Sequence, residues 1–307
     1  MIKRKSLLMI SIILILLAHL VYASENNENI IYVDDDNTNG PWDGSLIYPY
    51  LSIQDGIDAS SNGDIVYVKN GIYNEHVQIT KSINLNGEDN TNTIIFSLSK
   101  QDIIQVIDTN NVTISGFHIQ NDINYDQYMA AIHIKNTSHT IISDNIITGC
   151  YDGILLKSSY CTIINNTIEE NKNGICFGHY RSGQTGINQL FSHIDNFITK
   201  NHIKNNTETG LMLSYTKDNS ITKNEISSNG FGIRLWESTE NTLSSNNFIT
   251  NRINAFDMKD NSWNANYWDN WIGLKINIFS KIPCYIPGSI WPNFDWNPAK
   301  EPYEIIG

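Results

Sequence analysis

The chain has 307 residues, of which 40% are hydrophobic and 17% are charged, and its 20 Lys and Arg against 32 Asp and Glu give a formal net charge of −12. This length and apolar content are enough to bury a core. The acidic excess argues against nucleic acid and anionic membrane surfaces as partners, because both repel a polyanion.

Residues 1–23 have the pattern of a secretory signal peptide. Three cations at positions 3–5 precede an apolar run at 7–17, and Val21-Tyr-Ala23 resembles a cleavage site, so we expect cleavage after Ala23. The competing interpretation is an uncleaved anchor, but His19 interrupts the apolar run, and a span needs roughly 20 apolar residues. Cleavage would leave 20 − 3 = 17 cations against 32 acids, a net charge of −15. We expect a secreted or cell-surface protein, periplasmic if the cell has an outer membrane, with no later membrane span.

An acidic loop follows an expected strand at 30–33. The residues from Asp35 to Gly40 match the first half of a calcium loop of the form D-x-N-x-N-G, but Leu46 stands where that loop needs a bidentate Glu. The pattern therefore favours a solvated turn over a Ca²⁺ site. Next, Tyr50, Ile53 and Ile57 have helical spacing, which predicts a short amphipathic helix over 50–59 that covers the open end of the following domain.

A repeat dominates residues 140–260. Its first phrase is an apolar residue, two mostly polar residues, Asn, any residue and a second apolar residue, centred on Asn145, Asn166, Asn201, Asn224 and Asn246. Its second phrase, eight or nine residues later, starts at Gly153, Gly174, Gly210, Gly232 and Ala255. The steps between successive Asn residues are 21, 35, 23 and 22. A fixed period in the twenties indicates a solenoid, because one unit is too small to bury its own apolar face.

The alternation within these phrases has period two, which indicates strands rather than helices. Short strands in successive parallel coils make a parallel β-helix. The recurrent Asn suits its turns, because its amide can donate to one coil and accept from the next, and Asn tolerates left-handed backbone angles. The Gly before the second strand is expected to supply a turn conformation that other residues avoid.

Several segments resemble a known family. The resemblance lies in the opening runs 48–57, 63–68, 71–75 and 81–85, in the repeats, and in Asn266-Tyr-Trp-Asp-Asn-Trp271. Together they resemble the right-handed parallel β-helix proteins of the pectin-lyase-like superfamily, in particular the NosD-like branch named after periplasmic copper-binding proteins. The resemblance implies an all-β, single-stranded right-handed solenoid. It does not fix the function, since this architecture carries lyases, hydrolases, adhesins and chains without known activity.

The organisation expected from these features is a signal peptide (1–23), an N-terminal cap with the first strands (24–75), the β-helix (76–260) and a C-terminal cap (261–307). Five tryptophans lie in this last segment: Trp263, Trp268, Trp271, Trp291 and Trp296. We expect them to plug the end of the solenoid; a sugar-stacking surface is the alternative. Four cysteines are present, Cys150, Cys161, Cys176 and Cys284, and because the first three fall at different repeat positions, free thiols are favoured over a disulfide.

Two coils carry insertions. If Phe117 occupies the Asn position, the step to Asn145 is 28, and the step from Asn166 to Asn201 is 35, against a period of about 22. The extra residues lie at 121–128, before one strand, and at 179–193, after the equivalent strand two coils later. These loops should stand on opposite borders of one sheet face and form a groove, and long loops on a regular scaffold often carry function.

Strand alternation predicts which side chains line that face. One outward column is His133, Leu155, Cys176, Met212, Arg234 and Asp257, and the next is Lys135, Lys157, Gly178, Ser214, Trp236 and Lys259. Neighbours in a column should lie about 4.8 Å apart. Asp257 is expected to pair with Arg234.

Three chemistries make different demands on the residues of this face. Glycoside hydrolysis needs two carboxylates roughly 5–9.5 Å apart, which neither column supplies. The lyase reaction implied by the superfamily needs an unpaired cation, for which Arg234 or Lys157 are candidates, and carboxylates that hold calcium, for which only Asp122 and Asp126 of the first loop are candidates. Copper favours His, Cys and Met ligands; His133, Cys176, Met212 and His179 are of the right types, but His133 and Cys176 are two coils apart.

Glycan binding fits the aromatic and cationic side chains of this face best. The expected ligand-binding residues are Trp236, Arg234, Lys135, Lys157, Tyr125, Tyr128, Tyr180 and Arg181. The sequence therefore favours a non-catalytic surface protein that interacts with polysaccharide, with a polyuronate lyase and a copper-binding accessory protein as alternatives.

Overall fold

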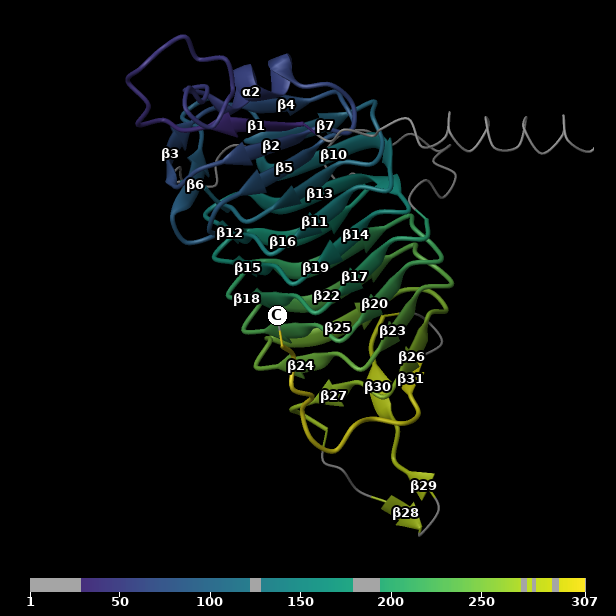
Figure 1. Cartoon of the computed structure of the whole chain (residues 1–307). Coiled ribbons are helices and arrows are strands. Elements are labelled where there is room, and N and C mark those ends of the chain that lie inside the picture. Colours follow the sequence, from purple (N-terminus) through teal and green to yellow (C-terminus); the bar gives the residue numbers. More distant parts are fainter. Residues whose placement is uncertain are drawn as a thin grey trace, which may run out of the picture.

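The computed structural model describes residues 29–121, 128–178, 194–271, 275–277, 280–288 and 293–306. Three parallel sheets run the length of the molecule and meet at turns, so that the chain winds through stacked coils (Figure 1). Each regular coil contributes one strand to each sheet, in the order sheet A, sheet B, sheet C. The predicted parallel β-helix is confirmed.

Sheet A has ten strands, in the order β1 (Ile30–Val33), β2 (Ile65–Val68), β5 (Asn84–Gly87), β8 (Thr113–Ser115), β11 (Ile141–Ser143), β14 (Thr162–Ile164), β17 (Phe197–Thr199), β20 (Ser220–Thr222), β23 (Thr242–Ser244) and β26 (Ser262–Asn264). Sheet B has nine: β3 (Gly71–Asn74), β6 (Thr93–Phe96), β9 (His118–Gln120), β12 (Ile146–Thr148), β15 (Thr167–Glu169), β18 (His202–Lys204), β21 (Glu225–Ser227), β24 (Asn247–Ile249) and β27 (Tyr267–Trp268). Sheet C has eight: β4 (Val77–Ile79), β7 (Ile104–Ile107), β10 (Ala130–Ser138), β13 (Asp152–Ser159), β16 (Asn173–Phe177), β19 (Thr209–Ser214), β22 (Phe231–Trp236) and β25 (Ile253–Asp257).

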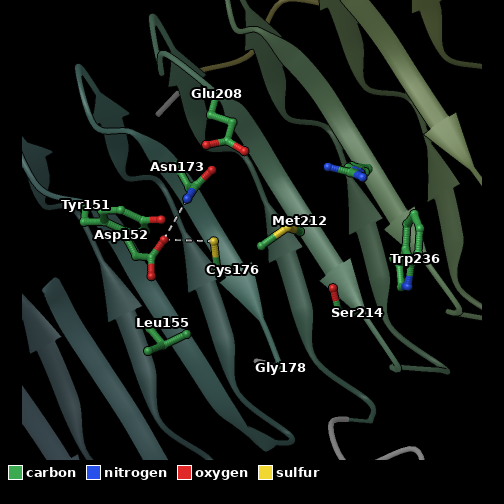
Figure 2. Close-up of a pocket in the computed structure, with 11 residues that line it drawn as sticks. Tyr151, Asp152, Leu155, Asn173, Cys176, Gly178, Glu208, Met212, Ser214 and Trp236 are labelled. Atoms are coloured by element: carbon green, nitrogen blue, oxygen red, sulfur yellow. Dashed lines mark hydrogen bonds between the residues drawn. The ribbon is translucent and has the colours of Figure 1, made fainter. Parts of the chain in front are cut away.

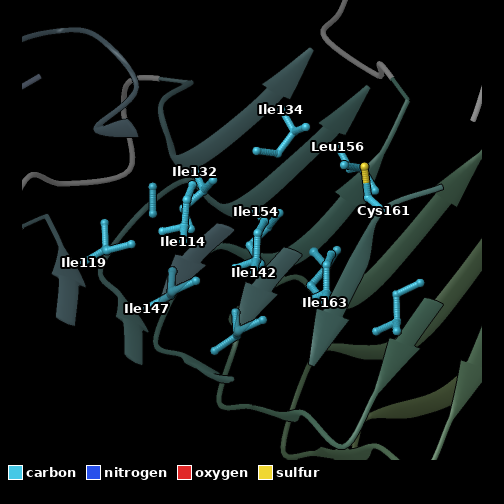
Figure 3. Close-up of a cluster of buried hydrophobic side chains, with 14 of the residues drawn as sticks. Ile114, Ile119, Ile132, Ile134, Ile142, Ile147, Ile154, Leu156, Cys161 and Ile163 are labelled. Carbon is cyan, nitrogen blue, oxygen red and sulfur yellow. The ribbon is translucent and has the colours of Figure 1, made fainter. Parts of the chain in front are cut away.

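The core is a stack of mostly aliphatic side chains, and most strands of sheets A and B contribute one inward apolar residue. Figure 3 shows how they meet between the sheets, with Ile142 of sheet A, Ile147 of sheet B and Ile154 of sheet C on one coil. Each is at most 1% exposed. Because no single coil can surround such a residue, its burial depends on the coils above and below, which is why the apolar phrases must recur at a fixed period.

Ladders of Asn side chains run along all three turns. The ladder at the turn between sheets A and B consists of Asn145, Asn166, Asn201, Asn224, Asn246 and Asn266. The Oδ1 atom of each Asn after the first accepts hydrogen bonds from the backbone N–H and the side-chain amide of the Asn before it. The Oδ1 atom of Asn145 accepts from the Phe117 N–H. A second ladder (Asn171, Asn206, Asn229, Asn251) joins sheets B and C, and a third (Asn196, Asn219, Asn241, Asn261) joins sheets C and A. The first was predicted; the other two were not.

The special backbone positions differ from expectation. Except at Asn261, the left-handed residue in these turns is the one before the ladder Asn, such as Lys200 with φ 57° and Lys223 with φ 55°, rather than the Asn itself. The repeat glycines do not have positive φ either. A Cβ at Gly174 would lie 2.4 Å from the Gly210 carbonyl oxygen, so glycine is required there because the next coil approaches closely.

The one described helix, α2 (Ile53–Ala59), covers the N-terminal end of the solenoid. The predicted helical cap is confirmed, although the helix begins at residue 53 rather than at residue 50. Ser52 caps it, its hydroxyl accepting from the Asp55 N–H, and Ile53 and Ile57 are buried against the first coils. The Glu75 carboxylate, which belongs to the first coil, accepts from the N–H groups of Ile53 and Gln54 and so fastens the helix to the solenoid. No helix among the described residues has the length and apolar character of a membrane span.

At the other end, β26 and β27 extend sheets A and B beyond residue 261, and two tryptophans close the core. Trp268 stacks on Phe248 with 4.4 Å between ring centroids, and Trp263 packs beside both. These two act as the predicted plug, and Trp271 packs partly buried against the core, whereas Trp296 remains 71% exposed and Trp291 lies outside the described residues.

Two antiparallel hairpins follow: β28 (Lys275–Asn277) with β29 (Ser280–Lys281), and β30 (Cys284–Ile286) with β31 (Asn293–Asp295). The buried Asp295 accepts from the Asn266 side chain and ends the first ladder.

All four cysteines are free and buried, in agreement with the prediction of thiols. Cys150 and Cys161 occupy ladder positions, since their N–H groups donate to Asn171 and Asn196 respectively. Burial raises the pKa of both thiols, to about 12 for Cys150. These two cysteines are therefore structural and unreactive in the folded state.

Candidate ligand-binding site

A pocket of about 150 Å³ opens on the outer face of sheet C, the face that the two insertions were expected to border (Figure 2). Its lining residues are Tyr151, Asp152, Leu155, Asn173, Cys176, Gly178, Glu208, Met212, Ser214, Arg234 and Trp236. They come from four successive strands, β13, β16, β19 and β22, and from the turns that lead into and out of them. The space is smaller than the roughly 300–1,000 Å³ typical of sites for drug-sized ligands, which suits a single ring-sized group.

The floor of the pocket is apolar. Leu155, Cys176 and Met212 stand side by side on β13, β16 and β19, and their Cα atoms are direct cross-strand partners. Leu155 and Cys176 form a small cluster with Ala130, against which Met212 packs, separate from the main core. This column was predicted correctly because the register runs without a shift from Ile132 to Ile233.

One wall carries polar side chains that strand alternation did not predict. Asp152 is 6% exposed, and its Oδ1 accepts from the Asn173 amide at 3.0 Å and from the Cys176 thiol at 3.2 Å. Strict alternation would place Asp152 on the inner face with Ile154. Gly153, packed under the Gly174 carbonyl, separates the two residues, and Asp152 lines the pocket instead. An acid or amide directly before the recurrent Gly was the signal that could have identified this wall.

Glu208 stands beside this wall, and its charge is partly balanced. Its Oε2 lies 3.6 Å from the Lys172 Nζ, and Lys172 in turn lies over the Tyr151 ring at 4.4 Å. The Glu208 side chain is half-exposed, so the pair contributes little to stability. Its effect is to place a negative edge on one side of the pocket.

The opposite end is cationic and aromatic. The Arg234 guanidinium carbon lies 5.3 Å from the Trp236 ring centroid, 5.5 Å from that of Phe231 and 5.9 Å from that of Phe256. Within the part of the chain that the structure describes, no carboxylate forms an ion pair with Arg234. The aromatic faces hold the cation in place without neutralising it.

The predicted pairing of Arg234 with Asp257 is wrong. In the last regular coil the partners are Ile233 with Ala255, Arg234 with Phe256 and Leu235 with Asp257, one residue away from the predicted register. A slip by one residue exchanges the two faces of a strand. Asp257 is therefore fully buried, where its carboxylate accepts from the Trp263 indole N–H at 2.8 Å and from the Asn261 amide at 2.7 Å.

The other predicted site residues are scattered. Lys135 and Lys157 are cross-strand partners on β10 and β13 but do not line the pocket. Tyr128 packs against the lining residue Tyr151 with 4.7 Å between ring centroids. The remaining candidates, Asp122, Tyr125, Asp126, His179, Tyr180 and Arg181, lie outside the described residues.

The predicted metal ligands His133, Cys176 and Met212 do not converge on one site. His133 does not line the pocket, and its Nδ1 bonds to Asp102 Oδ2 at 2.8 Å while Nε2 has no partner. Burial would raise the pKa of Asp102, but hydrogen bonds from His133, the Ala130 N–H and Gln105 outweigh it and lower the pKa. His133 is two coils from Cys176, about 10 Å. The described residues contain no group of three His, Cys, Asp or Glu side chains placed for a metal, so Cys176 and Met212 remain as a two-sulfur pair that suits Cu(I).

The fold has solved relatives of low sequence identity. The Dettilon tailspike protein (gp208) matches with a TM-score of 0.57 and 14% identity, over 80% of this chain and 48% of its own. Pectin methylesterase PemA from Erwinia chrysanthemi has a TM-score of 0.39 at 14% identity, over 70% and 82% of the two chains, and an alginate lyase from Paenibacillus has 0.42 at 11%, over 69% and 92%. The chain spans about half the length of the tailspike, and the likeness to the tailspike shows the right-handed parallel β-helix fold alone.

No curated protein matches the chain. The family model for NosD, described as a periplasmic copper-binding protein, matches residues 56–293, which make up 238 of the 307 residues. The matched segment begins in α2 and ends in β31, so it includes every strand of the three sheets except β1. The chain therefore belongs to the NosD family.

Proposed function

We propose that the protein is an exported, non-catalytic β-helix protein that binds an acidic saccharide in the pocket on sheet C. The observation that carries this proposal is the environment of Arg234, a cation held among three aromatic rings at the pocket edge with no carboxylate paired to it in the described chain. A bound carboxylate would supply the missing counter-charge through a bidentate pair.

The rest of the pocket suits the remaining groups of a sugar acid. The Trp236 indole beside Arg234 offers a flat face on which a pyranose ring can stack. Across the floor, Asp152 and Asn173 offer a carboxylate and an amide that bond well to hydroxyl groups. The negative edge at Asp152 and Glu208 repels a carboxylate, so the acid group of the ligand is directed to Arg234 and its hydroxyls to the opposite wall.

Calorimetric titration with a short oligogalacturonate tests this proposal. A neutral malto-oligosaccharide of equal length is the ligand control. Arg234→Gln should weaken binding of the acidic ligand about 10–100-fold, because a charge-assisted hydrogen bond contributes about 1.5–3 kcal/mol. Arg252→Gln is the matched variant, since Arg252 also lies near the Phe231 ring, at 5.9 Å, but does not line this pocket. Equal affinity for both ligands, or equal loss in both variants, would show that the pocket does not bind a sugar acid.

The same ligand tests the enzymatic alternative. A lyase reaction needs an unneutralised cation near acidic groups, and Arg234, Asp152 and Glu208 line one pocket. Incubation with polygalacturonate and calcium would give an unsaturated, ultraviolet-absorbing product if the protein cleaves it. Product that disappears in Arg234→Gln would replace the binding proposal by a lyase; we expect no product.

Copper binding is the second candidate, favoured by the adjacency of Cys176 and Met212 on neighbouring strands of the pocket floor. Cu(I) would be held by the Cys176 sulfur after loss of its proton and by the Met212 thioether. Competition with a chromogenic Cu(I) chelator measures the affinity, with Cys176→Ser and Met212→Leu as site variants and Cys161→Ser, a core cysteine, as control. If the wild type withdraws no Cu(I) from the chelator, or if all three variants behave alike, the pair is not a copper site.

A further inference from the structure

We propose that the outer face of sheet A between β8 and β26 is a second interaction surface, which binds an ordered, uncharged polysaccharide. This neutral face consists of two outward columns. They are Thr113, Ile141, Thr162, Phe197, Ser220, Thr242 and Ser262, and Ser115, Ser143, Ile164, Thr199, Thr222, Ser244 and Asn264. It is separate from the pocket on sheet C, and the inference does not depend on the proposed function.

The absence of charge distinguishes this face from the others. None of its 14 outward positions carries a charged residue, although the chain has a net charge of −12. The same coils carry charged residues on sheet B, where the Lys204 ammonium lies 3.3 Å from the Glu169 carboxylate, and the Glu225 carboxylate lies 3.8 Å from the His202 ring. A solvated sheet surface has no need to exclude Lys and Glu, so the exclusion over seven successive strands indicates that this face meets an uncharged partner.

The groups on the neutral face repeat regularly. Ten of the 14 positions are Ser or Thr, and their strands pair from β8 to β26 without a register shift. Direct stacking is visible in the hydrogen bond from Thr222 to Thr199, with 3.3 Å between their Oγ1 atoms. Hydroxyls therefore recur about every 4.8 Å along the solenoid axis, and the seven strands span about 29 Å.

Exposed apolar groups lie within this array. Phe197 is 54% exposed and Ile141 41% exposed, both in the first column. A hydroxylated surface with isolated apolar side chains complements a sugar polymer, whose rings present hydroxyls at their edges and C–H groups on their faces. Because the protein array and an ordered polymer both repeat, each additional coil adds a similar contact, and weak contacts sum to stable binding. An acidic polymer is disfavoured, because the neutral face supplies no cation.

Co-sedimentation of the purified chain with microcrystalline cellulose and with chitin particles tests the proposal. Calcium pectate particles serve as the acidic polymer for comparison. We expect retention on at least one neutral polymer, unchanged between 0.1 and 1 M NaCl, since no charges take part. Thr199→Lys/Thr222→Lys should lower the retained fraction about tenfold or more, because two ammonium groups would have to be desolvated against a neutral surface. Phe197→Ala should lower it as well.

Thr148→Lys/Thr167→Lys is the matched control, because it adds the same charges to the outer face of sheet B. Circular dichroism and thermal unfolding verify that all variants fold. The proposal is overturned if neither neutral polymer retains the protein, or if the sheet A and sheet B variants lose retention equally. It is also overturned if light scattering shows a dimer that Thr199→Lys/Thr222→Lys dissociates, because the neutral face would then bind a second copy.

Discussion

Removal of one ladder rung tests how the solenoid is held together. Asn201 is fully buried; its Oδ1 accepts from the N–H and the amide of Asn166, both at 3.0 Å, and its amide donates to the carbonyl oxygens of Ile163 at 2.9 Å and Thr199 at 3.0 Å. Asn201→Ala leaves the Asn166 N–H and the Ile163 carbonyl buried without these partners. At about 1–3 kcal/mol for each unsatisfied group, we expect a loss of about 2–6 kcal/mol in the free energy of unfolding.

Urea unfolding followed by far-ultraviolet circular dichroism measures this loss. Asn264→Ala is the control, because Asn264 lies exposed on β26, and its truncation should change stability by less than about 0.5 kcal/mol. A loss of less than about 1 kcal/mol for Asn201→Ala would contradict this expectation, since buried groups left without partners cannot cost so little unless water reaches them.

Three further predictions follow from buried groups. Burial raises the pKa of Asp257 to about 6, and hydrogen bonds from Trp263 and Asn261 offset this only in part, so the folded state binds a proton that the unfolded chain takes up only near pH 4. Stability relative to Asp257→Asn should therefore rise by up to about 2–3 kcal/mol as the pH falls from 7 to 4; a constant difference would contradict this. Gly174→Ala should destabilise the fold by about 1–3 kcal/mol in urea unfolding, because its Cβ would lie 2.4 Å from the Gly210 oxygen; an unchanged midpoint would show that the coils can move apart. Burial raises the pKa of Cys150 and Cys284 to about 12, so a thiol reagent should modify these two cysteines only after unfolding, and rapid labelling of either one in the native chain at pH 8 would refute its burial.

The sequence predicts most of the scaffold because the physical constraint is itself periodic. Every coil must place an apolar residue inward and a small or amide-bearing residue at its turns, so Asn201 and Ile198 could be assigned from spacing alone. The helix at 53–59 and the tryptophan plug at Trp263 and Trp268 also follow, since an open solenoid end must be covered. The second and third ladders are harder to predict because they begin with Cys150 and Cys161 rather than Asn.

The predicted strand register is wrong in the last coil, where the repeat lacks its Gly. Asn254 occupies the position that Gly has in the earlier coils, so the apolar pattern was aligned one residue late and Asp257 was assigned to the wrong face. The position of Asp152 in the pocket wall was not predicted for a related reason. The close packing at Gly153 breaks the alternation of inward and outward residues at the start of this strand. The floor and the Arg234 end, which lie within regular strands, were placed correctly.

A crystal structure of the protein with bound oligogalacturonate would show whether the pocket on sheet C holds a sugar acid. We expect a sugar carboxylate on the Arg234 guanidinium, the sugar ring against Trp236 and hydroxyls toward Asp152 and Asn173. A saccharide bound elsewhere, with the pocket on sheet C empty at saturating ligand, would contradict the proposal.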